Sequence, residues 1–376
     1  MINIFRRCVL GVLGAAVLFA ITPSSALATL ALNEPPTMPP VRMIKTNGIN
    51  LAVYEAGTGP AIILLHGFPG LAFTWRHQIP ALVDAGYRVI APDLRGYGLS
   101  DVPTKVEDYD IAHLTADVAG LLDALEVEKA IVMGHDWGGL LAWQMALFYE
   151  ERVAGVISLN TPHIPHWMLW LHPDLVRPAL PEEHDFKADP NVDPIEQKRE
   201  VYSPQMYVLM FQDGHVADEM MNKDVRATLR SALRKDLGTP SDWDKLPDAA
   251  VNMEYYGQNL PAKFPGKDVL NSSELDFYVR RFERTGFTPA INWYRNISRN
   301  WQAGLDVDQT IRVPSLMVSA ANDVVLRPSM AEGMDAHVTD LEWHVLADTW
   351  HWTPEERPKE LNRLVISWLE RRYPSP

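Results

Sequence analysis

The segment Gly134-His135-Asp136-Trp137-Gly138 places a carboxylate at the centre of a Gly-x-Asp-x-Gly pattern. An apolar run over 130–133 precedes it, and a helix is predicted over 140–149. This is the layout of a sharp strand-to-helix turn that lifts its central side chain into the open. A carboxylate held there can attack carbon and leave an ester. Asp136 could instead only cap the helix, because Asp is favoured at that position, but the preceding strand favours a nucleophile.

Hydrolysis of such an ester creates an oxyanion, which needs hydrogen-bond donors. One donor in this layout is the backbone N–H of the residue after the nucleophile, here Trp137. The second is predicted in the turn His66-Gly67-Phe68-Pro69-Gly70, which follows an apolar run over 61–65. Phe68 is the candidate because Pro69 has no N–H. Without the other motifs, the same segment would be an ordinary Pro/Gly turn.

Hydrolysis also needs a general base. In this layout an acid and then a histidine follow the nucleophile, each in a loop after a late strand. Asp323 follows a strand predicted over 313–320, and His351 follows the last predicted strand, so we predict them as orienting acid and base. Asp348 is so near His351 that it is the alternative acid. His344 lies within the last strand and is expected to be packed.

The elements that position these loops alternate regularly along the chain. Apolar runs predict strands over 41–45, 49–54, 61–65, 87–91, 130–133, 153–159, 314–319 and 342–346. Helices are predicted over 75–85, 114–125, 139–149 and 358–372. The turn Thr46-Asn47-Gly48 is typical of a hairpin between the first two strands. The alternation predicts an α/β fold with a mostly parallel eight-stranded sheet covered by helices.

One long interval breaks this alternation. Residues 165–300 hold several helix-like pieces but no comparable buried run, and we predict a helical cap there, inserted after the sixth strand. The core would then consist of residues 41–164 and 301–376.

The first 28 residues are predicted to be a secretory signal peptide. Two arginines precede a 14-residue apolar run over 8–21, and Ala26-Leu27-Ala28 is a small-x-small cleavage site. The run is shorter than the ~20 residues that span a bilayer, so export to the periplasm or medium is expected rather than the alternative, an uncleaved anchor. The proline-rich segment 29–40 is predicted to be an extended linker. The only cysteine is Cys8, so the mature chain would contain none.

Composition restricts the partners. With 47% hydrophobic and 22% charged residues, the 376-residue chain has a globular composition. Its net charge of −14 disfavours nucleic acid as a partner. The sequence contains no metal-ligand spacing and no phosphate-binding loop, so we expect neither a metal nor a cofactor. The oligomeric state is not predicted.

From residue 41 to the end, the chain resembles the epoxide hydrolases of the α/β-hydrolase superfamily. The motifs that carry the resemblance are His66-Gly67-Phe68-Pro69, Asp93-Leu94-Arg95-Gly96-Tyr97-Gly98, Gly134-His135-Asp136-Trp137-Gly138 and Trp350-His351-Trp352-Thr353. The family usually has Gly where Trp350 stands, which could reshape the loop but leaves the histidine in place. The resemblance implies attack of Asp136 on a small apolar epoxide, hydrolysis of the ester by water, and release of a vicinal diol.

The resemblance also implies two cap tyrosines that donate hydrogen bonds to the epoxide oxygen. Asn292-Trp293-Tyr294-Arg295-Asn296 matches the second family motif and gives this role to Tyr294. Tyr207-Val208-Leu209-Met210-Phe211-Gln212 resembles the first motif, with Met210 where an aromatic residue is common, and gives the role to Tyr207.

Both tyrosines are predicted on helices, which would open at Ser203-Pro204 and Thr288-Pro289. A tyrosine with a pKa near ~10 stays protonated at neutral pH and can donate a hydrogen bond. The alternatives are His163, His166 and Tyr202, since some exported bacterial relatives use a His/Tyr pair.

Other functions fit parts of the pattern. A haloalkane dehalogenase shares the fold, the Asp nucleophile and the Trp after it, but that family typically has Asn where Phe68 stands and does not use two tyrosines. A fluoroacetate-type dehalogenase has Arg where Trp137 stands. A non-catalytic binding protein on this fold often lacks the base or the nucleophile, whereas here all three triad positions are filled.

Overall fold

The computed structural model describes residues 37–180, 186–245, 252–253 and 266–375. The predicted signal peptide (1–28) and most of the predicted linker (29–40) lie outside the described residues. The chain divides into two units, Met1–Pro35 and Pro36–Pro376, and the fold below is that of the second unit. Among the described residues, no helix has the length and apolar character needed to cross a membrane.

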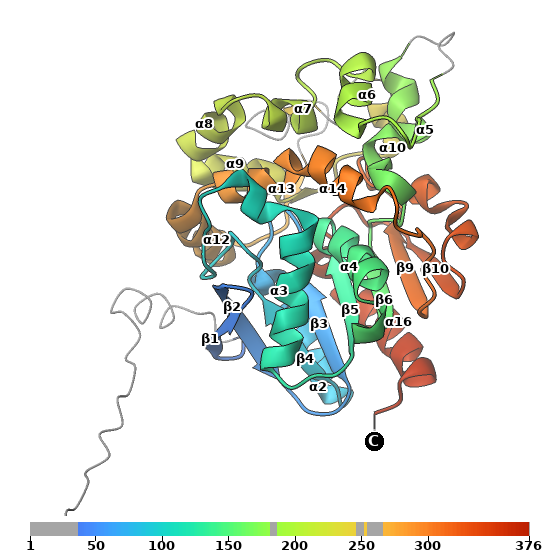
Figure 1. The fold of residues 1–376 in the computed structure, drawn as a ribbon. Helices are drawn as coiled ribbons and strands as arrows, with labels where there is room; N and C mark the ends of the chain where they lie inside the picture. The colour runs from blue at the N-terminus through green and yellow to red at the C-terminus, as the bar shows by residue number, and fades with distance from the viewer. Residues whose placement is uncertain (1–36, 181–185, 246–251, 254–265, 376) are drawn as a thin grey trace, which may run out of the picture. The chain divides into compact units, whose positions relative to one another are not determined.

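An eight-stranded sheet forms the core, in the order β1-β2-β4-β3-β5-β6-β9-β10 (Figure 1). Its strands are β1 (Val41–Thr46), β2 (Ile49–Ala56), β3 (Ala61–Leu65), β4 (Arg88–Pro92), β5 (Ala130–His135), β6 (Val153–Leu159), β9 (Ser315–Ala320) and β10 (Leu341–Leu346). The strands β1 and β2 form an antiparallel hairpin, β2 pairs antiparallel with β4, and the other pairs are parallel. Asn47 and Gly48 in the hairpin turn have φ values of 41° and 80°, as a two-residue turn of this twist requires. The α/β prediction and its eight strands are therefore confirmed.

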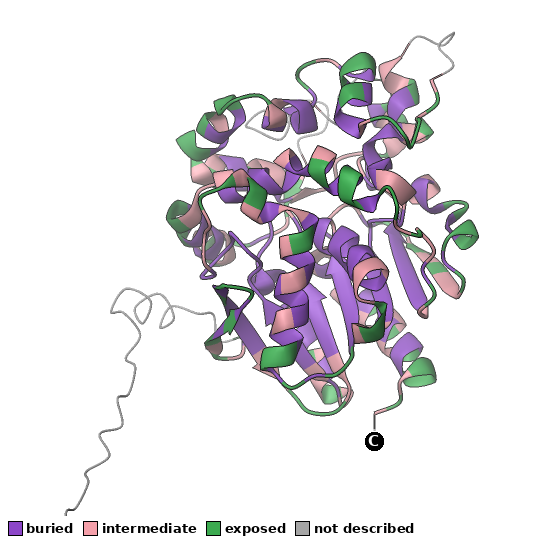
Figure 2. Ribbon diagram, viewed as in Figure 1, coloured by how far each residue is buried: buried purple, intermediate pink, exposed green. Residues whose placement is uncertain are grey.

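Helices cover the sheet, and its central strands are buried (Figures 1 and 2). The covering helices are α2 (Gln78–Asp84), α3 (Ile111–Ala124), α4 (Trp137–Phe148) and α16 (Pro358–Arg372). The last agrees with its prediction. The first three begin elsewhere than predicted: α2 follows a separate 3₁₀ turn, α3 starts one turn earlier because Asp110 caps it, and α4 starts directly after Asp136.

A cap lies between β6 and β9, as predicted, and covers one edge of the sheet (Figure 1). Its helices are α5 (Pro173–Val176), α6 (Pro194–Val201), α7 (Tyr207–Gln212), α8 (Val216–Lys223), α9 (Val225–Ala232), α10 (Pro240–Trp243), α12 (Ser272–Thr285), α13 (Thr288–Arg295) and α14 (Ile297–Gly304).

Two details of the cap differ from the prediction. The helix α7 begins at Tyr207 rather than at Ser203-Pro204, because the Met206 N–H closes a separate turn on the Ser203 carbonyl. A two-stranded ribbon of β7 (Arg234–Lys235) and β8 (Lys267–Asp268) lies among the helices of the cap. Strands of two residues have no detectable period in a sequence.

Candidate active site

The turn between β5 and α4 presents Asp136 to a cavity. Asp136 has φ 54° and ψ −121°, a conformation that non-glycine residues rarely adopt. The flanking glycines make the turn possible, because a Cβ at Gly134 would collide with the Gly138 carbonyl, and one at Gly138 would collide with the Leu65 carbonyl. The strand-to-helix turn predicted from the glycine pattern is therefore present.

Both predicted oxyanion donors contact the Asp136 carboxylate. The Phe68 N–H donates to Oδ1 at 2.7 Å, and the Trp137 N–H also donates to the carboxylate. His66 holds the Phe68 loop, because its Nε2 accepts from the Leu94 N–H at 3.0 Å and its Nδ1–H donates to the Gly67 carbonyl. Burial lowers the pKa of His66 to about 4, so this imidazole is neutral.

The predicted base and acid lie beside the nucleophile. His351 Nδ1 is 2.9 Å from Asp323 Oδ2, and His351 Nε2 is 3.8 Å from Asp136 Oδ2. The second oxygen of Asp323 accepts from the Val325 and Leu326 N–H groups, each at 3.0 Å. The carboxylate of Asp323 is thus fixed by the loop that follows β9.

The two neighbouring candidates are placed elsewhere. Asp348, the alternative acid, is exposed and lies 3.6 Å from Arg357. The prediction that His344 is packed is wrong: its side chain is 42% exposed and pairs with Glu342. The reason is that β10 is an edge strand, which the run of residues alone does not reveal.

Charge and burial oppose each other in this cluster. Burial raises the pKa of Asp136, although the charge of His351 and the two N–H donors act against it. Burial lowers the pKa of His351, but the charges of Asp323 and Asp136 outweigh it and raise that pKa to about 9. Burial also raises the pKa of Asp323, but His351, the Leu326 N–H and Asn160 together hold it at about 2. At neutral pH the site therefore contains an imidazolium between two carboxyl groups.

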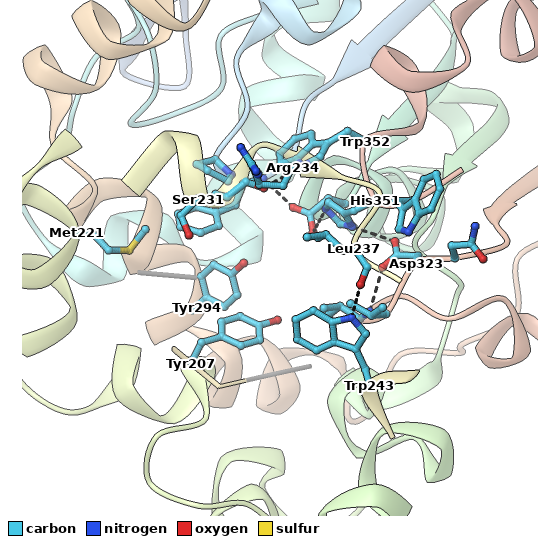
Figure 3. Close-up of a pocket in the computed structure, with 18 of the residues that line it drawn as sticks. Tyr207, Met221, Ser231, Arg234, Leu237, Trp243, Tyr294, Asp323, His351 and Trp352 are labelled. Atoms are coloured by element: carbon cyan, nitrogen blue, oxygen red, sulfur yellow. Dashed lines mark hydrogen bonds and ion pairs between the residues drawn. The ribbon is translucent and has the colours of Figure 1, made fainter. Parts of the chain in front are cut away.

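The two predicted cap tyrosines line the same cavity as the triad (Figure 3). Tyr207 from α7 and Tyr294 from α13 pack edge to face with ring centroids 5.7 Å apart, and both hydroxyls point into the cavity. Burial raises the pKa of each phenol, so both remain protonated. The Trp170 indole N–H donates to the Tyr207 oxygen at 2.6 Å.

The cavity is small, with a volume of about 90 Å³, and its wall is mainly apolar. The apolar lining consists of Phe68, Pro69, Phe211, Met221, Ala232, Leu237, Trp243, Val324, Val325, Trp350 and Trp352. Apolar walls with a few converging polar groups are typical of sites for small apolar ligands. Within the described residues, no group of three or more His, Cys, Asp or Glu side chains could hold a metal ion.

Comparisons with known proteins agree with this geometry. A family model described as alpha/beta hydrolase fold matches residues 60–186. Epoxide hydrolase A of Mycobacterium tuberculosis is 37% identical over 342 residues, which cover 88% of this chain and 97% of that protein. The chain belongs to the epoxide hydrolase family. The crystal structure of epoxide hydrolase A from Mycobacterium thermoresistibile has a TM-score of 0.73 and 38% identity, and the match covers 88% of this chain and 98% of that one.

Three mammalian relatives that the chain matches are longer than it is. Bifunctional epoxide hydrolase 2 of Sus scrofa is 37% identical over 326 residues, which cover 86% of this chain but 54% of that protein. The chain therefore spans about half the length of the mammalian relatives that it matches.

Trp350 directly precedes the predicted base, at the position where the family resemblance led us to expect Gly. Its indole N–H donates to the Gly238 carbonyl at 2.7 Å, so it ties the histidine loop to the cap and forms part of the cavity wall. His351 keeps its place beside Asp136. Trp350 therefore contributes to the wall without displacing the base.

The alternative donors do not line the cavity. His163 Nε2 lies 2.8 Å from the Gln309 carbonyl, and the Tyr202 hydroxyl donates to the Trp170 carbonyl at 2.8 Å. The backbone N–H of His166 donates to the Gln309 side chain. The structure thus places Tyr207, not one of these three, beside Tyr294.

Two residues near the base were not predicted. Asn160, directly after β6, donates to Asp323 Oδ2 at 2.8 Å and accepts from the Thr353 hydroxyl at 2.7 Å. Its place at the carboxyl end of a predicted strand was the signal that could have identified it. Glu356 accepts from the N–H groups on both sides of His351, those of Trp350 at 3.0 Å and Trp352 at 2.9 Å. No sequence pattern indicates this double contact.

Proposed function

We propose that the protein opens an epoxide to a vicinal diol through a covalent ester on Asp136. The observation that carries the proposal is the convergence of the Asp136 nucleophile, the His351 base and two protonated tyrosines on one apolar cavity. A hydrolase that formed an ester from a haloalkane would need the first two groups but not the tyrosine pair. The tyrosines therefore favour an oxygen leaving group.

In the first step, Asp136 Oδ2 attacks a ring carbon, because Oδ1 is held by the Phe68 N–H. The C–O bond of the epoxide breaks, and Tyr207 and Tyr294 donate hydrogen bonds to the departing oxygen. That oxygen needs one proton to become a hydroxyl. His351 can supply one, because esterification removes the Asp136 charge that helps to raise its pKa.

In the second step, the neutral His351 removes a proton from water, which attacks the ester carbonyl carbon of Asp136. Negative charge develops on Oδ1, to which the Phe68 N–H already donates, and the Trp137 N–H donates to the same carboxylate. Collapse of this intermediate breaks the bond between Cγ and Oδ2, and the hydroxyl that came from water gives its proton to the departing alkoxide oxygen, so the diol is released and the carboxylate is restored. Asp323 stabilises the imidazolium that forms. One oxygen of the regenerated Asp136 carboxylate then comes from water.

The test is product analysis with matched substrates. Purified protein is incubated with styrene oxide, aliphatic epoxides and haloalkanes, and diol and halide are measured separately. Diol from epoxides, absent in Asp136→Ala, is the expected result. Halide release without diol would contradict the proposal and favour a dehalogenase.

We also propose that the protein is exported to the periplasm or medium. The support is the charged, apolar and small-x-small order of residues 1–28. N-terminal sequencing of protein from cell fractions is expected to give a mature start near Thr29 outside the cytoplasm. Membrane-bound protein that retains Met1 would contradict export by cleavage.

A further inference from the structure

Lys198 is a buried cation in the cap that the proposed mechanism does not use. It lies on α6, and its side chain is completely buried. Its ammonium group donates to the Pro194 carbonyl, one turn earlier on the same helix, at 3.3 Å. In the described part of the chain, no carboxylate forms an ion pair with it, although the charge of Asp193 acts on it from the start of the helix. Burial of a charge without an ion pair is costly.

The aromatic partner of this cation connects it to the active site. Lys198 Nζ lies 5.4 Å from the centre of the Trp170 ring, within the range of a cation–π contact. The N–H of the same ring donates to the Tyr207 oxygen at 2.6 Å, and the Trp170 carbonyl accepts from the Tyr202 hydroxyl. Trp170 is thus held at its backbone and at its ring, between a buried charge and a predicted catalytic phenol.

The physical effect has a definite direction. A cation beside an indole draws electron density away from the N–H, which becomes a stronger hydrogen-bond donor. A phenol oxygen that accepts a stronger hydrogen bond has a more polarised O–H, which donates more strongly in turn. The O–H of Tyr207 points into the cavity, where the epoxide oxygen would leave.

We propose that Lys198 is a positioning residue for ring opening, which acts through Trp170 to orient and polarise the Tyr207 hydroxyl. The proposal rests on the proposed epoxide hydrolase function. It concerns the formation of the ester alone, because the second step takes place at Asp136 and His351 and does not involve the phenols.

The test separates the two steps by rapid mixing and quenching. Lys198→Met removes the charge and keeps an unbranched side chain that is only one atom shorter. We expect formation of the Asp136 ester to slow roughly threefold to tenfold, the range for weakening one hydrogen bond, and its hydrolysis to remain within about twofold of the original rate. Lys223→Met, at an exposed lysine on α8, is the matched control and should change neither step. The measurements are made at slightly acidic pH, because burial lowers the pKa of Lys198 to about 7.

A double-mutant cycle distinguishes this role from a purely structural one. In a Tyr207→Phe background, Lys198→Met should cause no further slowing, because the acceptor of the Trp170 N–H is gone. Lys198→Arg, which retains the charge, should restore ester formation toward the original rate. If Lys198→Met does not fold, Trp170→Phe tests the same path, since it removes the N–H and keeps an aromatic ring.

Three results would overturn the proposal: equal slowing in both backgrounds, equal slowing of both steps, or no slowing at all. Failure of the proposed function would look different, because the original protein would then form no ester on Asp136. If the ester forms and Lys198→Met forms it at the original rate, only the role of Lys198 is refuted.

Discussion

Replacing either cap tyrosine by phenylalanine tests which step the phenols serve. Tyr207→Phe and Tyr294→Phe each remove one hydrogen-bond donor to the departing oxygen and keep most of the buried volume. Loss of one preorganised donor can cost on the order of 10²–10³ in rate, and the remaining tyrosine should soften that loss. We therefore expect slower ester formation in each variant, nearly unchanged ester hydrolysis, and no epoxide turnover in the double variant.

The structure adds a second effect that is specific to Tyr207. Its oxygen accepts the Trp170 indole N–H at 2.6 Å, and phenylalanine leaves that buried N–H without this acceptor. An unsatisfied buried donor costs about 1–3 kcal/mol. The free energy of unfolding of Tyr207→Phe in urea should fall by about this amount. A control is Tyr87→Phe, whose hydroxyl donates to the Tyr373 carbonyl far from the cavity, and which should leave both catalytic steps unchanged.

The assay follows one turnover with enzyme in excess over a chromogenic or radiolabelled epoxide. Ester and diol are quantified at each time after acid quenching, so both rate constants come from one experiment. If ester formation is equally fast in the original protein and in both single variants, Tyr207 and Tyr294 are packing residues. The dehalogenase interpretation, or a different pair of donors, would then be preferred.

Three further outcomes follow from the residues around the base. Glu356→Gln leaves one acceptor oxygen for the two N–H groups beside His351, where the carboxylate has two. Ester hydrolysis should therefore slow more than ester formation in the same assay. Equal slowing of both steps would contradict a role of Glu356 in holding the base. The pKa of His351 is raised from 6.5 to about 9, so its protonation should add up to about 3 kcal/mol to the free energy of unfolding. This contribution should be complete below pH 6.5 and lost as the pH rises through 9. Urea unfolding that shows no such loss relative to His351→Gln would contradict the ion pairs. Asp323→Asn should lower the pKa of His351 in an NMR titration, and an unchanged value would mean that Asp323 is not its charged partner.

The core and the triad could be predicted because their signals are local. Each buried strand is a short apolar run, and each predicted catalytic loop directly follows such a run, as Asp323 follows β9 and Asp136 follows β5. The positions on either side of Asp136 leave no room for a Cβ atom, so the glycines there indicate the sharp turn. These features need no knowledge of how distant segments pack.

The features that were missed depend on packing between distant segments. Trp170 and Tyr207 are in contact although they are 37 positions apart in the chain, and Lys198 contacts Trp170 from another helix. Residue spacing within a single helix or strand therefore cannot predict either contact. The exposure of His344 depends on β10 being the last strand of the sheet, which is a property of strand order. The start of α7 was misplaced because a local turn at Ser203 competes with the Ser-Pro helix signal.

The covalent ester on Asp136 is the central claim, and mass spectrometry of His351→Gln tests it most directly. This variant keeps the nucleophile and the cap tyrosines, so a tyrosine hydroxyl must supply the proton that the opened ring needs. It lacks the base that activates water. The variant is incubated with an epoxide that the original protein hydrolyses. Its intact mass should increase by the mass of one substrate molecule, and peptide mapping should place the increase on Asp136. The Asp136→Ala variant should show no increase. A His351→Gln variant that releases diol at the original rate with no adduct would contradict the account.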